Sequence, residues 1–107
     1  MRERRIDQRI PFTGRVFELT CGGQIPCGSV NIGEGGVYIR RYEGGVLLDG
    51  EHVWLELQLP GNESRPIWAL GQVVEQVCET FHDAAAIRFK GMPDRDRERL
   101  RRFVAAA

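Results

Sequence analysis

The chain has 107 residues, which is enough for one domain of ordinary size. Hydrophobic residues make up 42% of it and charged residues 28%, a composition that fits a folded globular protein and excludes an intrinsically disordered one. Lys and Arg (15) balance Asp and Glu (15), so the chain lacks the basic excess that binding of long nucleic acid requires.

A charged arm, residues 1–11, opens the chain; it is rich in arginine, ends at Pro11 and is expected to be flexible. The 13 glycines, about 12% of the chain against an average of about 7%, indicate many tight turns and favour an all-β fold. Turn signals separate six predicted strands, at residues 12–21, 25–32, 37–40, 52–59, 66–77 and 83–89.

The strand predicted at 52–59 has the clearest pattern, because apolar and polar residues alternate along it as in a half-buried strand. The strand at 66–77 is apolar on both faces, with Trp68 on one and Ile67 on the other. A helix or a second subunit is therefore expected to cover its second face. Trp54 and Trp68 have two interpretations: they are buried under the terminal helix, or they anchor a protein contact.

The last segment changes to a helical period. Pro93 suits a first helical turn, and Leu100, Phe103 and Val104 form one apolar stripe on an otherwise charged helix. Six strands joined by short loops and followed by one helix predict an all-β fold. We expect residues 12–107 to form a single domain, a six-stranded antiparallel β-barrel with a C-terminal α-helix.

No group of residues indicates catalysis or metal binding, so we expect neither an enzyme nor a cofactor. Cys21, Cys27 and Cys78 cannot all pair, and their spacing does not fit a zinc site. His52 and His82 stand alone in the sequence. The N-terminus leads into no apolar segment and no stretch is long enough to insert in a membrane, so a cytoplasmic protein is expected.

Two short motifs are not needed to form a barrel. The first is the pair Arg5 and Arg9 on the arm, preceded by Arg4. A guanidinium presents a planar fork of donors that matches a phosphate or the O6/N7 edge of guanine. Such a terminus can also be simply solvated.

The second motif covers residues 31–36, where one predicted strand ends and the next begins. Asn31 offers an amide donor and acceptor to a base edge, and Gly33, Gly35 and Gly36 let a ligand approach the backbone. The alternative is an ordinary glycine-rich β-turn.

In this order and spacing the two motifs resemble those of the PilZ domain family, Arg-x-x-x-Arg followed by (Asp/Asn)-x-Ser-x-x-Gly. Arg5 and Arg9 match the first motif, and Asn31 and Gly36 match the second. The resemblance extends over nearly the whole chain, including the stretch at 86–89 and the helix at 96–103. It implies a PilZ-type barrel and a bacterial receptor for the second messenger cyclic di-GMP.

The resemblance also implies residue roles. Arg5 and Arg9 would contact guanine edges and phosphates, Asn31 a guanine from the barrel side, and Gly36 would keep the turn open. Arg4 would favour binding of an intercalated pair of ligands over a single one. Gly33 replaces the motif serine, and the missing hydroxyl would weaken binding by about two- to tenfold.

Two functions follow from the sequence. The first is a cyclic di-GMP receptor, a monomer or homodimer, whose arm orders on ligand binding and relays the signal to a protein partner. The second is an adaptor that binds no cyclic di-GMP and acts through protein contacts in motility or pilus assembly. A barrel that binds single-stranded nucleic acid is disfavoured, because the chain is neutral and has few aromatic residues outside apolar patterns.

Overall fold

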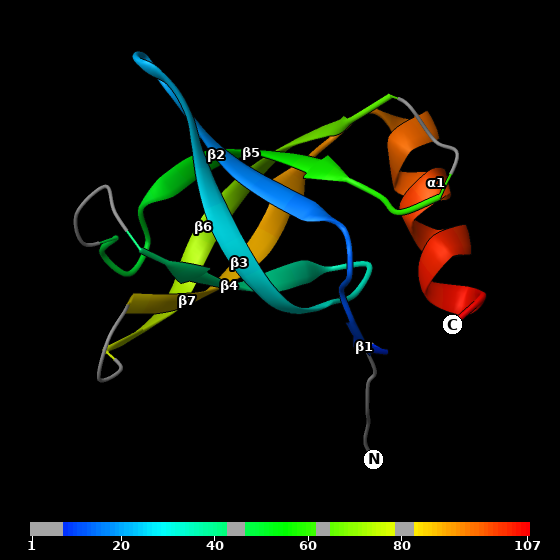
Figure 1. Cartoon of the computed structure of the whole chain (residues 1–107), viewed down its shortest axis with the longest axis horizontal. Coiled ribbons are helices and arrows are strands. Elements are labelled where there is room, and N and C mark those ends of the chain that lie inside the picture. Colours follow the sequence, from blue (N-terminus) through cyan, green and yellow to red (C-terminus); the bar gives the residue numbers. More distant parts are fainter. Residues whose placement is uncertain (1–7, 43–46, 62–64, 79–82) are drawn as a thin grey trace.

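A computed structural model describes residues 8–42, 47–61, 65–78 and 83–107. In chain order the elements, labelled in Figure 1, are β1 (Ile10–Pro11), β2 (Arg15–Thr20), β3 (Gly23–Ile32), β4 (Gly36–Arg41), β5 (His52–Gln58), β6 (Ile67–Cys78), β7 (Asp83–Gly91) and α1 (Asp94–Ala105). All the strand pairs are antiparallel.

The strands form one sheet in the order β1-β3-β2-β5-β6-β7-β4, and pairing of β4 with β3 closes six of them into a barrel. β3 reaches three neighbours because it is long: its first half pairs with β2 and its second half with β4 and β1. The predicted six-stranded antiparallel barrel with a C-terminal helix is therefore confirmed. The short β1 is an additional strand beside β3.

The barrel interior is the hydrophobic core. β5 buries Val53, Leu55 and Leu57, the alternate positions that its pattern predicts. Removal of such side chains from water is the main stabilising contribution to a small barrel. The largest fully buried side chains come from all six barrel strands and from α1: Val16, Ile32, Val37, Ile39, Leu55, Leu57, Ile67, Val73, Ile87 and Leu100.

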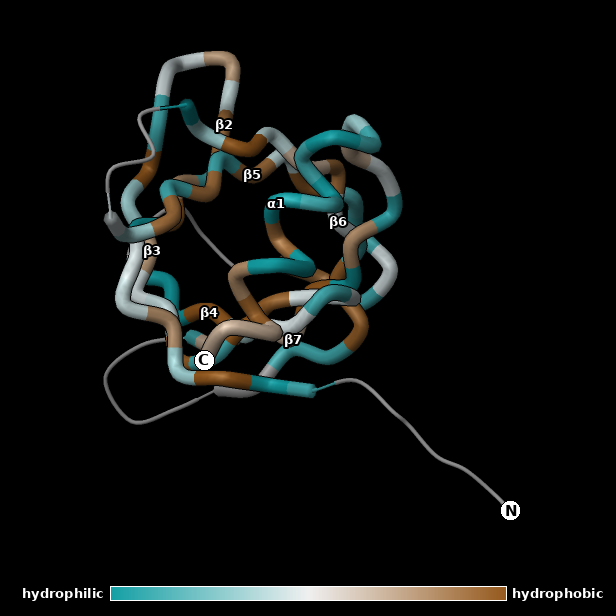
Figure 2. Tube along the Cα trace, turned by 90° about the vertical axis from the view of Figure 1, so that its right-hand side faces the viewer, coloured by the Kyte–Doolittle hydropathy of each residue, from teal (hydrophilic) through white to brown (hydrophobic). Residues whose placement is uncertain are grey.

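Helix α1 covers one end of the barrel, and Figure 2 shows it in front of the ring of strands. Its predicted apolar stripe is confirmed: Leu100 and Val104 are buried, and Phe103 packs edge-on against Phe12, with ring centroids 5.9 Å apart. Asp96 lies in the first turn of α1, where a negative charge is favourable to the helix dipole.

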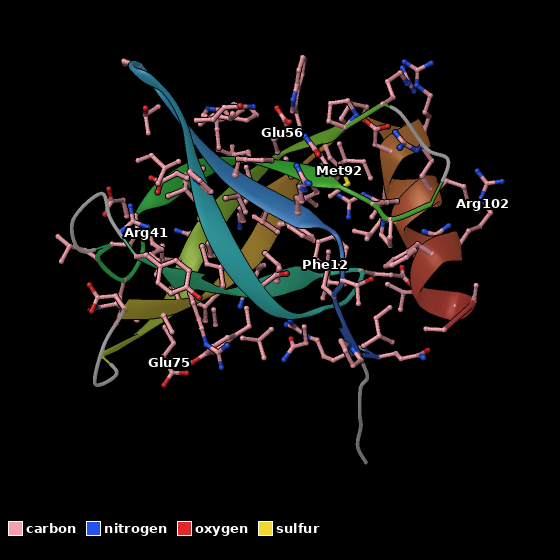
Figure 3. All side chains as sticks on the ribbon, in the orientation of Figure 1. Phe12, Arg41, Glu56, Glu75, Met92 and Arg102 are labelled. Carbon is pink, nitrogen blue, oxygen red and sulfur yellow. The ribbon has the colours of Figure 1, made fainter. Side chains whose placement is uncertain are left out.

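A buried ion pair lies toward the opposite end of the barrel, where Figure 3 labels Arg41. Arg41 donates from Nε and Nη2 to Oε1 of Glu18, at 3.0 and 2.6 Å. The Arg41 side chain is 3% exposed and that of Glu18 is 12% exposed. The pair joins β2 to β4 across the barrel, because these two strands are not neighbours in the sheet.

The first barrel strand begins three residues later than predicted, at Arg15. Phe12 turns into the core against α1, which takes residues 12–14 out of the ladder. A Cβ added to Gly14 would lie closer than 3.0 Å to the backbone oxygen of Gln58, so this close approach requires glycine. The sequence pattern shows that Phe12 is apolar, but it does not show that Phe12 packs against the helix instead of continuing the strand.

At the end of the arm predicted over residues 1–11, Ile10–Pro11 forms β1, and the flexibility of the arm stays a prediction. A helix or a second subunit was expected to cover the second face of the strand at 66–77. Helix α1 does not cover it, because α1 lies at the end of the barrel and leaves Trp68 and Val74 exposed on that face. Trp54 and Trp68 are 53% and 57% exposed, so their burial under the helix is excluded.

Candidate ligand-binding site

The short strand β1 brings the two sequence motifs together. Ile10 pairs with Ile32 and Pro11 with Asn31, so Arg9 emerges beside the turn that follows β3. Nη1 of Arg9 donates a hydrogen bond to Oδ1 of Asn31, at 3.3 Å, across 22 residues of sequence. The structure thus places Arg9 and Asn31 in one site, whereas Arg4 and Arg5 lie outside the described residues.

The turn at residues 33–36 is held against β7. The Gly33 amide donates to the Gly36 carbonyl at 2.9 Å, and the Phe89 amide donates to the Gly35 carbonyl at 2.8 Å. A Cβ on Gly36 would lie closer than 3.0 Å to the Ile87 carbonyl oxygen. Positive φ angles occur at Gly23, Gly50 and Gly61 among the described glycines, so Gly36 is required for close packing and not for an unusual backbone angle.

A pocket of about 440 Å³ adjoins this turn, and its lining residues come from the end of the arm, the turn, β6 and β7: Arg9, Gly35, Val74, Ala86, Ile87, Arg88 and Phe89. Two of its lining residues, Arg9 and Arg88, carry guanidinium groups. An open pocket with two arginines and apolar residues suits a ligand that combines negative charge with a flat apolar face.

Arg88 and Val74 are site residues that sequence reasoning missed. Arg88 pairs with Gly36 in the β4–β7 ladder and points outward between the buried Ile87 and Phe89, an alternation already visible in the sequence. Val74 is 49% exposed because it follows the buried Val73 in the alternation of β6, and a register irregularity lies between Val73 and Glu75. A bulge of this kind has no clear sequence signal.

The turn is also tied to helix α1. Nε of Arg101 donates to Oε1 of Glu34 at 3.2 Å, and Nη1 of Arg101 donates to Glu98 at 2.6 Å. These bonds raise the pKa of Arg101 above its ordinary value, with the Glu34 bond as the largest cause. Both side chains of the Arg101–Glu34 pair are about half exposed, so the link orients the turn more than it stabilises the fold.

The described residues offer no alternative chemical centre. Within them no three His, Cys, Asp or Glu side chains gather as metal ligands would. Burial raises the pKa of the Cys27 thiol to about 11, and the negative charge of Glu18 adds to this effect, so Cys27 is a poor nucleophile. His52 is exposed, and His82 lies outside the described residues. Within the described ranges, no helix has the length and apolar character to cross a bilayer.

Comparison with known proteins identifies the family. The family model of the PilZ domain matches residues 3–106, nearly the whole chain. The chain belongs to the PilZ domain family. No curated protein sequence matches this PilZ domain.

Three solved structures share the fold of this PilZ domain. The Bacillus subtilis inhibitor of motility MotI/DgrA has a TM-score of 0.84 at 20% identity, over 96% of this chain and 50% of that one. Escherichia coli YcgR in complex with c-di-GMP gives 0.73 at 14% identity, over 97% and 46% of the two chains. The PilZ domain of YcgR with c-di-GMP gives 0.69 at 12% identity, over 96% and 90%. The chain thus spans about half the length of MotI and of YcgR.

Proposed function

We propose that this PilZ domain is a receptor for cyclic di-GMP and acts as a binding protein, not an enzyme. The observation that carries the proposal is the contact of Arg9 with Asn31 beside a pocket that also contains Arg88. Membership of the PilZ family and the c-di-GMP complexes of YcgR, which has the same fold, support this ligand.

The proposed roles combine the family motif with the pocket. Arg5 and Arg9 bind phosphates and guanine edges, Asn31 binds a guanine, and Arg4 favours two stacked ligands. These charge-assisted bonds are stronger than the neutral bond that Gly33 cannot make, so binding is weakened but not lost.

Gly35 and Gly36 shape the turn at the pocket, and Arg88 supplies a further guanidinium from β7. Val74 offers an apolar contact on which a purine face can rest. The ligand would therefore lie between the segment before β1 and the outer face of β6 and β7.

Ligand binding would fix the residues that precede β1 against the barrel and change the surface offered to a protein partner in the cytoplasm. Both a monomer and a homodimer are compatible with this relay. The second candidate function is an adaptor that binds no cyclic di-GMP. It is favoured by the absence of the motif hydroxyl at Gly33 and by the exposure of Trp54 and Trp68.

Calorimetric titration with cyclic di-GMP distinguishes the two functions. We expect the wild type to bind and Arg5→Ala, Arg9→Ala and Arg88→Ala each to bind about 10- to 150-fold more weakly, the range for loss of a hydrogen bond to a charged group. Arg102→Ala is the matched control, because Arg102 is exposed on α1 and is not part of the pocket. Absence of heat with the wild type would exclude the receptor function and favour the adaptor function.

Gly33→Ser tests the position of the ligand. The restored hydroxyl should tighten binding about two- to tenfold, the value of one neutral hydrogen bond. Unchanged affinity would mean that residue 33 does not face the ligand.

A further inference from the structure

The outer face of β2, β5 and β6 carries two rows of large side chains. Register pairs Leu19 with Trp54 and Trp54 with Leu70 in one row, and Phe17 with Glu56 and Glu56 with Trp68 in the next. Residues directly opposite in antiparallel strands share a face, so these rows form one surface. We call it the tryptophan face, and its apolar members are Phe17, Leu19, Trp54, Trp68 and Leu70.

The carboxylate of Glu56 holds this face in a fixed arrangement. Glu56 is only 7% exposed although it lies on the outer side of β5 (Figure 3). It accepts hydrogen bonds from Nε1 of Trp68 at 3.1 Å, from Gln24 at 2.8 Å and from Gln58 at 2.8 Å. The Trp68 indole is therefore oriented before any contact forms, which reduces the entropy that a partner must remove on binding.

Two tryptophans that are each more than half exposed, in adjacent rows of one sheet, are unusual on a surface that touches only water. Tryptophan is the residue type most enriched among the energetic anchors of protein interfaces. Trp54 and Trp68 are diagonal neighbours, within reach of one another's contacts. The face thus resembles the centre of an interface more than a scatter of single apolar residues.

Three arginines lie along one edge of the tryptophan face. Arg15 pairs in register with Gln58 at its edge, and Arg65 and Arg95 line a hollow of about 410 Å³ together with Trp68. Arg15, Arg65 and Arg95 are exposed. Among the described residues at this edge, the carboxylates of Glu56 and Asp96 are buried, and Arg65 lies 4.0 Å from Asp96. Three exposed arginines against the one exposed carboxylate of Asp94 give this edge an excess of positive charge.

We propose that the tryptophan face is the docking surface for a segment of a partner protein that presents an apolar side chain flanked by Asp or Glu. The apolar side chain packs against Trp54 and Trp68, and its acidic neighbours meet the exposed arginines.

The proposal specifies the partner in the proposed relay but does not depend on ligand binding. The tryptophan face shares no residue with the pocket beside Arg9. Val74, at that pocket, is four residues beyond Leu70, the nearest member of the tryptophan face on β6, about 13 Å at roughly 3.3 Å per residue. Loss of either surface can therefore be measured with the other intact.

Selection from a displayed library of random peptides on the immobilised protein tests the proposal. We expect enrichment of peptides that carry an aromatic or large aliphatic residue flanked by Asp or Glu. A synthetic peptide of the enriched sequence should bind Trp54→Ala at least about tenfold more weakly, and Arg65→Glu/Arg95→Glu similarly. Trp54 is preferred to Trp68 for this test because no described hydrogen bond depends on it.

Val74→Ala is the matched control: it removes exposed apolar surface from the same strand outside the tryptophan face and should leave peptide affinity unchanged. Enrichment of basic or uncharged peptides, enrichment of none, or equal binding by Trp54→Ala would overturn the proposal. Sedimentation that shows a dimer abolished by Trp54→Ala would assign the face to a second copy instead.

The same peptide separates this proposal from the receptor function. Arg9→Ala should keep peptide affinity while it loses cyclic di-GMP affinity, and Trp54→Ala should do the reverse. Loss of both affinities in Arg9→Ala would contradict the independence of the two surfaces.

Discussion

Single residues of the second motif have a structural role that accompanies any role in binding. Gly36 is the clearest case, because a Cβ there would meet the Ile87 carbonyl and come within 3.3 Å of the Arg88 Cα. Backbone atoms of a paired strand cannot move aside as a flexible side chain can. A glycine at this position would therefore be required in a barrel of this geometry even without a ligand.

Gly36→Ala should lower the free energy of unfolding by about 1–3 kcal/mol, the usual cost of overpacking. Gly91→Ala on β7 is the matched control, because its Cβ would meet nothing within 4 Å, and its stability should change by less than about 0.5 kcal/mol. Urea denaturation of both variants measures the difference. Equal midpoints would contradict the close packing of β4 against β7.

The Cys27 thiol provides a test at the scale of one titrating group. Burial, and secondly the charge of Glu18, raise its pKa to about 11, so only about 0.1% of it is thiolate at pH 8. A raised pKa means that the folded protein prefers the protonated thiol. The associated stability is present below about pH 9 and is lost as the pH rises through 11.

Iodoacetamide labelling, followed by tandem mass spectrometry, should modify Cys27 about 100-fold more slowly than the exposed Cys21 at pH 8. The Cys27 rate should rise about tenfold per pH unit up to about pH 10. Similar rates for both thiols at pH 8 would show that Cys27 is accessible and ionised.

At the scale of elements, alternation and turn signals were sufficient to predict the barrel strands and the helix. β5 illustrates why: its apolar positions are the buried ones, and a strict alternation of apolar and polar residues is typical of a strand and not of a helix. Two features were not predicted, because no local sequence pattern indicates them. The two-residue β1 depends on a partner 22 residues away, between Ile10 and Ile32, and the bulge at Val74 depends on the register of β6 with β7.

The candidate site was predictable only in part for the same reason. The motif identified Arg9 and Asn31, and β1 explains how they meet. Arg88 carries no motif and becomes a candidate only when β7 pairs with β4 beside the turn. Glu56 is a second example, because a charged residue at an outward position predicts exposure, whereas three neighbouring donors bury it.

The ion pair of Glu18 with Arg41 tests the connection of β2 to β4 across the barrel. Glu18→Ala or Arg41→Ala alone should lower the free energy of unfolding by about 3–5 kcal/mol, because each removes one partner of a buried ion pair. The double variant Glu18→Leu/Arg41→Met should lose much less, since no charge remains buried. Chemical denaturation of the four proteins gives the coupling energy, and two single losses below about 1 kcal/mol would assign the pair little structural weight.

At the scale of the whole molecule, zero net charge conceals two separate positive regions. Arg9 and Arg88 belong to the pocket at the β1 end, whereas Arg15, Arg65 and Arg95 lie along one edge of the tryptophan face. Some of the balancing carboxylates form ion pairs or hydrogen bonds within the fold and are largely buried, as are those of Glu18, Glu56 and Asp96. A neutral chain can therefore present one surface to a small anion and another to an acidic protein segment.

Ligand binding should stabilise the whole barrel, because the pocket joins β1, the turn before β4, β6 and β7. Cyclic di-GMP at 100 times its dissociation constant should raise the free energy of unfolding by about 2.7 kcal/mol. For a domain near 100 residues this corresponds to a rise in Tm of about 10–20 °C. Thermal unfolding with and without ligand measures it, with Arg9→Ala as the variant that should show a much smaller rise at the same ligand concentration. A wild-type Tm that does not change at any ligand concentration is the result expected of the adaptor, whose barrel is already complete without a nucleotide.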